Sequence, residues 1–81
     1  MTRDKIKDDL NNIFREIFED NTIAVTDQTT AKEVEKWDSV SHIDMICMVE
    51  DVFQVKLTTK EVSSLNNVGE LISVIERKLQ P

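Results

Sequence analysis

Several residues that could do chemistry stand together between Asp38 and Cys47. This stretch holds Ser39 together with the only histidine, His42, and the only cysteine of the chain. A hydrolytic serine needs a histidine base within hydrogen-bond reach, an orienting acid and an oxyanion hole. His42 follows Ser39 by three residues and is expected to project toward the core, and no Gly-x-Ser-x-Gly turn surrounds the serine. The pattern therefore argues against a catalytic triad, and we expect no enzyme activity.

The same stretch does not have the spacing of a metal site. His42 and Asp44 are two residues apart, so on a helix they point to different sides, and no third ligand is at hand. A single cysteine cannot form an internal disulfide. We therefore predict no metal, and interpret Cys47 as a small apolar contact residue.

Ser39 has a more informative setting as the opening residue of a helix. Asp38 is a good N-cap, because its carboxylate can accept bonds from free backbone N–H groups. The start of a helix also offers unpaired amides and the positive end of the helix dipole, which favour a phosphate group. Ser39 is thus well placed to carry a phosphodiester, and the alternative is an ordinary helix-start residue, which is what most serines at this position are.

Hydrophobic periodicity predicts the helices that position this serine. The predicted ranges are about 3–19, 39–53, 59–65 and 68–79. Thr58 to Glu61 and Asn67 to Glu70 have the spacing at which two side chains cap each other's backbone amides, which marks the last two helix starts. The first helix has one apolar stripe made of Ile6, Leu10, Ile13, Phe14 and Ile17.

Between the first two helices the periodicity fades, which indicates a long loop over residues 20–37. A helical turn is expected near 30–36, and Ile23, Val34 and Trp37 are the predicted apolar anchors. The sequence thus predicts an all-α four-helix bundle with three longer helices and a short one, as a single domain over 1–81.

Composition limits the classes of partner. Sixteen acidic against ten basic residues give a net charge of −6, which would repel nucleic acid. No apolar run is long enough to span a bilayer, and the N-terminal residues lack the apolar core of a signal peptide. We therefore expect a cytoplasmic monomer that binds neither nucleic acid nor membrane.

The helix over 39–53 divides into two predicted faces. Ile43, Ile46, Val49 and Phe53 form the expected core stripe, with Met45 at its margin. The opposite face mixes acidic and apolar groups, and no Lys or Arg occurs between residues 38 and 55. Such a face could dock basic partners, although a simple solvated acidic surface is the alternative. The residues of this predicted docking face are Val40, Asp44, Cys47, Met48 and Asp51, with Glu50 beside them.

The residues around Ser39 resemble a known family. Trp37–Val40 and the residues that follow resemble the Asp-Ser-Leu segment and second helix of acyl carrier proteins, and the order of helices and loop extends the likeness over nearly the whole chain. The matching residues after Val40 are Ile43, Ile46, Glu50, Asp51 and Phe53.

The resemblance implies a carrier role. Ser39 would be esterified to 4′-phosphopantetheine, which a phosphopantetheinyl transferase takes from coenzyme A, and the terminal thiol would hold an acyl group as a thioester. Asp38 would cap the helix and help the transferase position the serine. The predicted docking face would meet the transferase and the acyl-loading and acyl-processing enzymes through their basic patches.

Departures from the family pattern bear on the pathway. Ser41 stands where carriers of fatty-acid synthesis usually have another acid, and His42 replaces a smaller residue. The loop also lacks the glycine-rich run common in those carriers. These differences favour a dedicated acyl pathway over bulk fatty-acid synthesis. An aminoacyl or peptidyl carrier, or a helical adaptor without the arm, are the alternatives.

Overall fold

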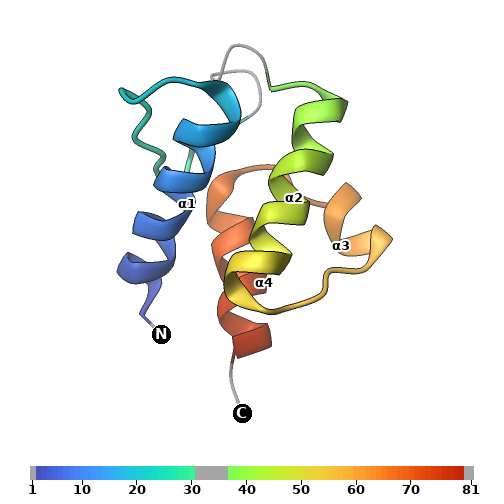
Figure 1. Ribbon diagram of the computed structural model, residues 1–81. Coiled ribbons are helices and arrows are strands. Elements are labelled where there is room, and N and C mark those ends of the chain that lie inside the picture. Colours follow the sequence, from blue (N-terminus) through green and yellow to red (C-terminus); the bar gives the residue numbers. More distant parts are fainter. Residues whose placement is uncertain (1, 31–36, 80–81) are drawn as a thin grey trace.

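The computed structural model describes residues 2–30 and 37–79, and within these ranges the chain is helical, without strands. The helices are α1 (Arg3–Phe18), α2 (Ser39–Phe53), α3 (Thr59–Ser63) and α4 (Val68–Leu79) (Figure 1). The predicted all-α bundle is confirmed, with α1 ending at Phe18 rather than 19 and α3 at Ser63 rather than 65. Val34 and the turn predicted near 30–36 fall on residues 31–36, outside the described ranges.

Side chains and left-handed residues set the ends of the two longest helices. The Thr2 hydroxyl caps α1 by accepting a hydrogen bond from the Lys5 N–H at 3.2 Å. Glu19 and Gln54 follow α1 and α2 in the left-handed conformation, with φ of 52° and 56°. A residue in the left-handed conformation ends a helix, and its N–H still satisfies a carbonyl of the last turn.

The two predicted capping arrangements at the starts of α3 and α4 differ in outcome. At α3, Thr58 and Glu61 bond each other's backbone N–H, as predicted. At α4 the Asn67 amide oxygen accepts from the Glu70 N–H at 2.9 Å, but the Glu70 carboxylate accepts from Asn66 instead of Asn67. The second prediction is therefore only half right.

The hydrophobic core lies where α1 packs against α2 and α4. Figure 1 shows α1 and α3 on opposite sides of α2 and α4. No residue of α3 is fully buried, so the short helix covers the bundle without contributing to its centre. The largest fully buried side chains are Phe14, Ile6, Leu10, Met45, Leu71, Ile72, Ile75, Val49 and Val68.

The predicted core stripes need two corrections. On α1, Ile17 is only partly buried, and the next residue, Phe18, takes the buried position. On α2, Ile43 is 56% exposed, whereas Met45, expected at the margin, is buried. The reason is that α1 packs against one flank of α2, whereas the flank that bears Ile43 is left open.

The first half of the long loop is tied to α1 and α4. Val25 is buried, and its N–H donates to the Asn11 side chain at 2.7 Å. The Gly69 N–H donates to the Asp27 carbonyl at 2.9 Å, and a Cβ built on Gly69 would lie 2.8 Å from that oxygen. Glycine is thus required for this approach. Ile23 packs partly buried against the core, as predicted.

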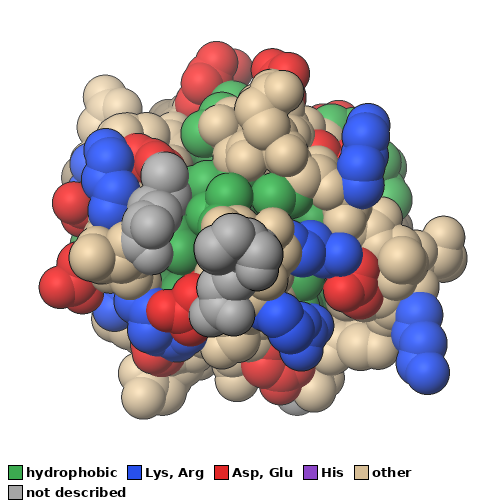
Figure 2. Space-filling model, turned by 90° about the horizontal axis from the view of Figure 1, so that it is seen from below, with side chains coloured by type: hydrophobic (Ala, Val, Ile, Leu, Met, Phe, Trp, Pro, Cys, Tyr) green, Lys and Arg blue, Asp and Glu red, His purple; other side chains and the backbone are tan. Residues whose placement is uncertain are grey.

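Ion pairs on the same side of the molecule strengthen this tie. Asp27 pairs with Arg3 at 3.3 Å and with Lys7 at 3.1 Å, and Arg3 also reaches Glu76 on α4. On the face seen in Figure 2, basic and acidic side chains lie interleaved. None of the described helices is long and apolar enough to cross a membrane.

Candidate functional site

The start of α2 is built by a reciprocal pair of hydrogen bonds. The Asp38 carboxylate accepts from the Ser41 N–H, and the Ser41 hydroxyl accepts from the Asp38 N–H, both at 2.9 Å. The bonds from the Ser41 N–H and hydroxyl lower the pKa of the Asp38 carboxyl. Asp38 is therefore the N-cap, as the sequence indicated. The part played by Ser41 was missed, although a serine three residues after a cap is a recognisable signal.

Ser39 is the first residue of α2, and its side chain is exposed. Asp38 and Ser41 cap the helix between them, so the Ser39 hydroxyl is not needed for the helix to begin. It stands at the positive end of a helix of 15 residues. The structure thus presents one accessible hydroxyl where a phosphate would be stabilised.

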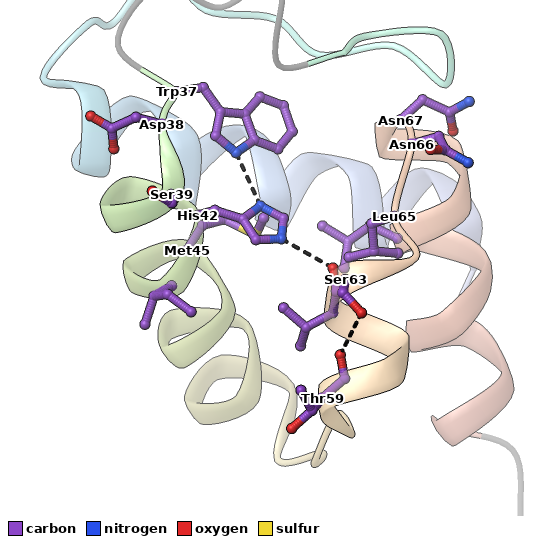
Figure 3. A pocket seen from close by; sticks show the side chains of 13 residues that line it. Trp37, Asp38, Ser39, His42, Met45, Thr59, Ser63, Leu65, Asn66 and Asn67 are labelled. Carbon is purple, nitrogen blue, oxygen red and sulfur yellow. Dashed lines mark hydrogen bonds between the residues drawn. The ribbon is translucent and has the colours of Figure 1, made fainter.

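A cavity of about 570 Å³ opens beside Ser39, between α2 and α3 (Figure 3). Asp38 and Ser39 line it from the start of α2. The apolar part of its lining comes from α2, α3, the turn after α3 and the start of α4, and consists of Ile43, Met45, Val62, Leu65 and Leu71. The Ile43 side chain, predicted to be core, therefore belongs to the cavity and the surface.

Trp37 and His42 form another wall of this cavity. The Trp37 Nε1–H donates to His42 Nδ1 at 3.1 Å, and His42 Nε2 lies 3.3 Å from the Val62 carbonyl oxygen of α3. Figure 3 shows both contacts as dashed lines. Because both ring nitrogens are engaged with Trp37 and Val62, His42 is not placed as a base for Ser39.

Trp37 is confirmed as an anchor of the loop. Its ring meets that of Phe14 edge-on, with centroids 5.1 Å apart, and it stacks on the His42 ring at 5.9 Å. The contact between Trp37 and His42 escaped the sequence reading, because Trp37 precedes the helix and helical spacing does not relate the two residues.

The structure supports part of the predicted docking face as open surface. Val40 is 71% exposed, and Asp44, Cys47 and Asp51 are also exposed. Ile43 adds a second exposed apolar side chain to this side of α2.

Two other residues of that face have a structural task instead. Met48 is partly buried and packs against the core, which corrects its placement on a face that packing does not need. Glu50 accepts a hydrogen bond from the Leu57 N–H at 2.8 Å and so holds the turn after α2. The docking role of this surface stays a prediction.

Comparison with solved structures decides the family. The solution structure of a holo acyl carrier protein from Geobacter metallireducens superposes with a TM-score of 0.84 at 38% identity, over 89% of this chain and 83% of the other. This chain belongs to the acyl carrier protein family. The crystal structure of an acyl carrier protein from Thermotoga maritima has a TM-score of 0.83 at 28% identity, over 95% of this chain and 89% of the other. Family sequence profiles and curated protein sequences gave no match.

The family agrees with the site geometry. Carriers present a group to other proteins and do not transform it, which is consistent with an exposed Ser39 hydroxyl and a His42 ring that is bonded elsewhere. The resemblance inferred from the residues around Ser39 is confirmed at the level of family and fold.

Proposed function

We propose that this protein carries acyl groups on a 4′-phosphopantetheine arm joined to the Ser39 hydroxyl and presents them to partner enzymes. When bound, the arm supplies a terminal thiol that holds the acyl group as a thioester. The observation that carries the proposal is the exposed Ser39 at the first turn of α2, beside an apolar cavity, in a member of the acyl carrier protein family.

The residues present fit such a group. A phosphodiester on Ser39 would lie at the positive end of α2, and no charged side chain other than the cap occupies the first turn. Esterifying the Ser39 hydroxyl would leave the cap intact, because Asp38 and Ser41 bond each other. The chain can therefore accept the group without loss of helix structure.

The exposed side of α2 supports docking of basic partners. Asp44 and Asp51 supply negative charge, while Val40 and Ile43 supply apolar area that a partner can cover. Charge steers the encounter, and the apolar contacts add affinity once water is displaced. The partners proposed for this surface are the phosphopantetheinyl transferase and the enzymes that load and process the acyl group.

A dedicated acyl pathway is the proposed setting. At the third position of α2 the serine of the cap stands where carriers of fatty-acid synthesis usually have an acid, so the first turn carries less negative charge than theirs. Partners that select this carrier would therefore rely more on Asp44, Asp51 and the apolar pair Val40 and Ile43.

Mass spectrometry tests the proposal directly. The protein incubated with coenzyme A and a broad-specificity phosphopantetheinyl transferase should gain the mass of one 4′-phosphopantetheine group, and Ser39→Ala should gain none. Ser63→Ala is the matched control, because Ser63 is exposed and lines the same cavity, and it should be modified like the wild type. An unmodified wild type would favour the helical adaptor, and a modified S39A would move the site elsewhere.

A further inference from the structure

The His42 ring links Trp37, which precedes α2, to the helix α3. Within the described ranges, no other side chain of the cavity wall makes this link by hydrogen bonds. The His42 Nδ1 receives the N–H of Trp37, and its Nε2 faces the Val62 carbonyl of α3. An indole N–H can only donate, and a carbonyl oxygen can only accept. One form of the imidazole satisfies both partners, namely the neutral ring with its proton on Nε2.

A second proton on the ring would change this arrangement. Nδ1 would then carry a hydrogen that points at the Trp37 N–H, so two donors would face each other. The bond to Val62 could persist, because Nε2 remains a donor. The imidazolium could also stay near the Trp37 ring, since a cation over an aromatic face is attracted to it. The expected change is therefore a turn of the ring that releases the Trp37 N–H.

We propose that His42 is a proton-sensitive clasp on the cavity beside Ser39. In its neutral form it ties Trp37 to α3 and holds the cavity wall together, and protonation releases Trp37 and widens access to the cavity. The proposal rests on the proposed function only for the identity of the group that would enter.

The clasp acts on a weakly anchored part of the fold. None of the five residues of α3 is fully buried. Apart from partly buried Val62, its visible ties are the ion pairs of Glu61 with Lys78 and Arg77. On the other side, Trp37 is held by Phe14 of the core. Protonation should therefore loosen the Trp37 side of the cavity wall while the core stays packed, and only loss of both His42 bonds should free α3.

Few ionisable groups of the described ranges stand near the clasp. Among the described residues that line the cavity, Asp38 is the only other ionisable one, and its carboxylate is bonded to Ser41. On α3, Glu61 accepts from the Thr58 N–H and pairs with Lys78, and Lys60 is exposed. Phe14 of the core meets the Trp37 ring, and Leu71 of α4 lines the cavity, and neither residue is ionisable. No described carboxylate bonds the ring, whose hydrogen-bond partners are Trp37 and the Val62 carbonyl.

The chain is suited to a direct test, because it has one histidine and one tryptophan. The unmodified protein is titrated from about pH 8 to about pH 5 while NMR follows the His42 ring and the Trp37 indole N–H. We expect the indole signal to shift, and its exchange with water to accelerate severalfold, in step with the ring. Binding of the neutral hydrophobic dye Nile red should rise over the same pH range.

Two variants separate the clasp from a merely structural role. His42→Gln offers one acceptor and one donor but does not titrate, so its indole N–H should stay protected across the whole range. His42→Phe retains an aromatic ring without either bond, so it should bind the dye strongly at every pH. Where H42F does not fold, wild type and H42Q alone decide the question.

Two results would overturn the clasp. One is an indole N–H that does not respond while His42 titrates, and the other is H42Q with the same pH response as wild type. Because these measurements need no arm on Ser39, failure of the modification experiment and failure of the clasp are distinguishable.

Discussion

The two sides of α2 differ in how they are closed. Toward α1 the helix packs buried side chains such as Val49 against the rest of the core. Toward α3 it faces a cavity of about 570 Å³ and leaves Ile43 more than half exposed. The difference indicates that most of the stability comes from the first side, whereas the second side leaves accessible space beside Ser39.

The largest expected effect comes from truncating the closed side. Phe14→Ala removes a fully buried ring that also touches Trp37, and should lower the free energy of unfolding by about 3–5 kcal/mol. That is a large share of the roughly 5–15 kcal/mol typical of a small domain. Ile43→Ala, on the open side, should cost only about 0.5 kcal/mol or less.

Denaturation in urea measures both variants. If Ile43→Ala lowers the free energy of unfolding as much as Phe14→Ala does, the cavity side is also a source of stability. That result would contradict the proposed difference between the two sides. Equal slopes against urea concentration would show that neither variant changes the extent of unfolding.

A second test concerns the tie between the loop and α4. Gly69→Ala places a Cβ about 2.8 Å from the Asp27 carbonyl oxygen, a backbone atom that cannot turn aside. The resulting strain should cost about 1–3 kcal/mol, more than the gain of about 1 kcal/mol from alanine's helix propensity. Ser73→Ala, also on α4 but exposed, should change stability little. A stabilised Gly69→Ala would show that the loop yields without cost.

The open side can be tested through charge. Asp44→Lys with Asp51→Lys should slow loading by the transferase by about tenfold at low salt, because a basic partner loses its steering field. The difference should shrink in high salt, which screens exposed charges. Initial rates of arm transfer at several salt concentrations provide the measurement.

A matched charge reversal on α1 serves as its control. Asp8→Lys with Glu16→Lys changes the net charge by the same amount on exposed positions of α1. Loading should remain near the wild-type rate. If the α1 pair slows loading as much as the α2 pair does, the rate depends on the overall charge. The exposed side of α2 would then have no specific role in docking.

Sequence predicted the extent of α2 better than the environment of its individual side chains. Periodicity gave the bounds of α2 and α4, and residue type gave the Asp38 cap, because both depend on neighbours along the chain. The positions of Ile43 and Met48 were wrong, because helical spacing does not reveal which flank another helix covers.

Side-chain contacts across elements were equally out of reach. The Glu50 carboxylate holds the Leu57 N–H across a turn, and His42 bonds Trp37 and α3. Neither contact repeats a helical interval, and each depends on how the chain returns on itself. These are the contacts that shape the open side of the molecule, where sequence patterns carry the least information.

The smallest expected effect concerns the Asp38 cap at the start of α2. Hydrogen bonds from Ser41 lower the pKa of the Asp38 carboxyl in the folded protein. A carboxyl with a lowered folded pKa adds stability that is complete above its ordinary pKa of about 3.9 and is lost as the pH falls through the lower folded value. Asp38→Asn keeps a neutral cap without this pH dependence.

The wild type should therefore have the higher thermal midpoint near neutral pH, and its advantage over D38N should disappear below about pH 4. Asp27 and Glu61 also have lowered pKa values, but both proteins share them, so the difference isolates Asp38. Thermal melts of the two proteins across this range supply the measurement. An advantage that persists unchanged into acid would mean that the charge of Asp38 does not contribute, and that its cap acts through hydrogen-bond geometry alone.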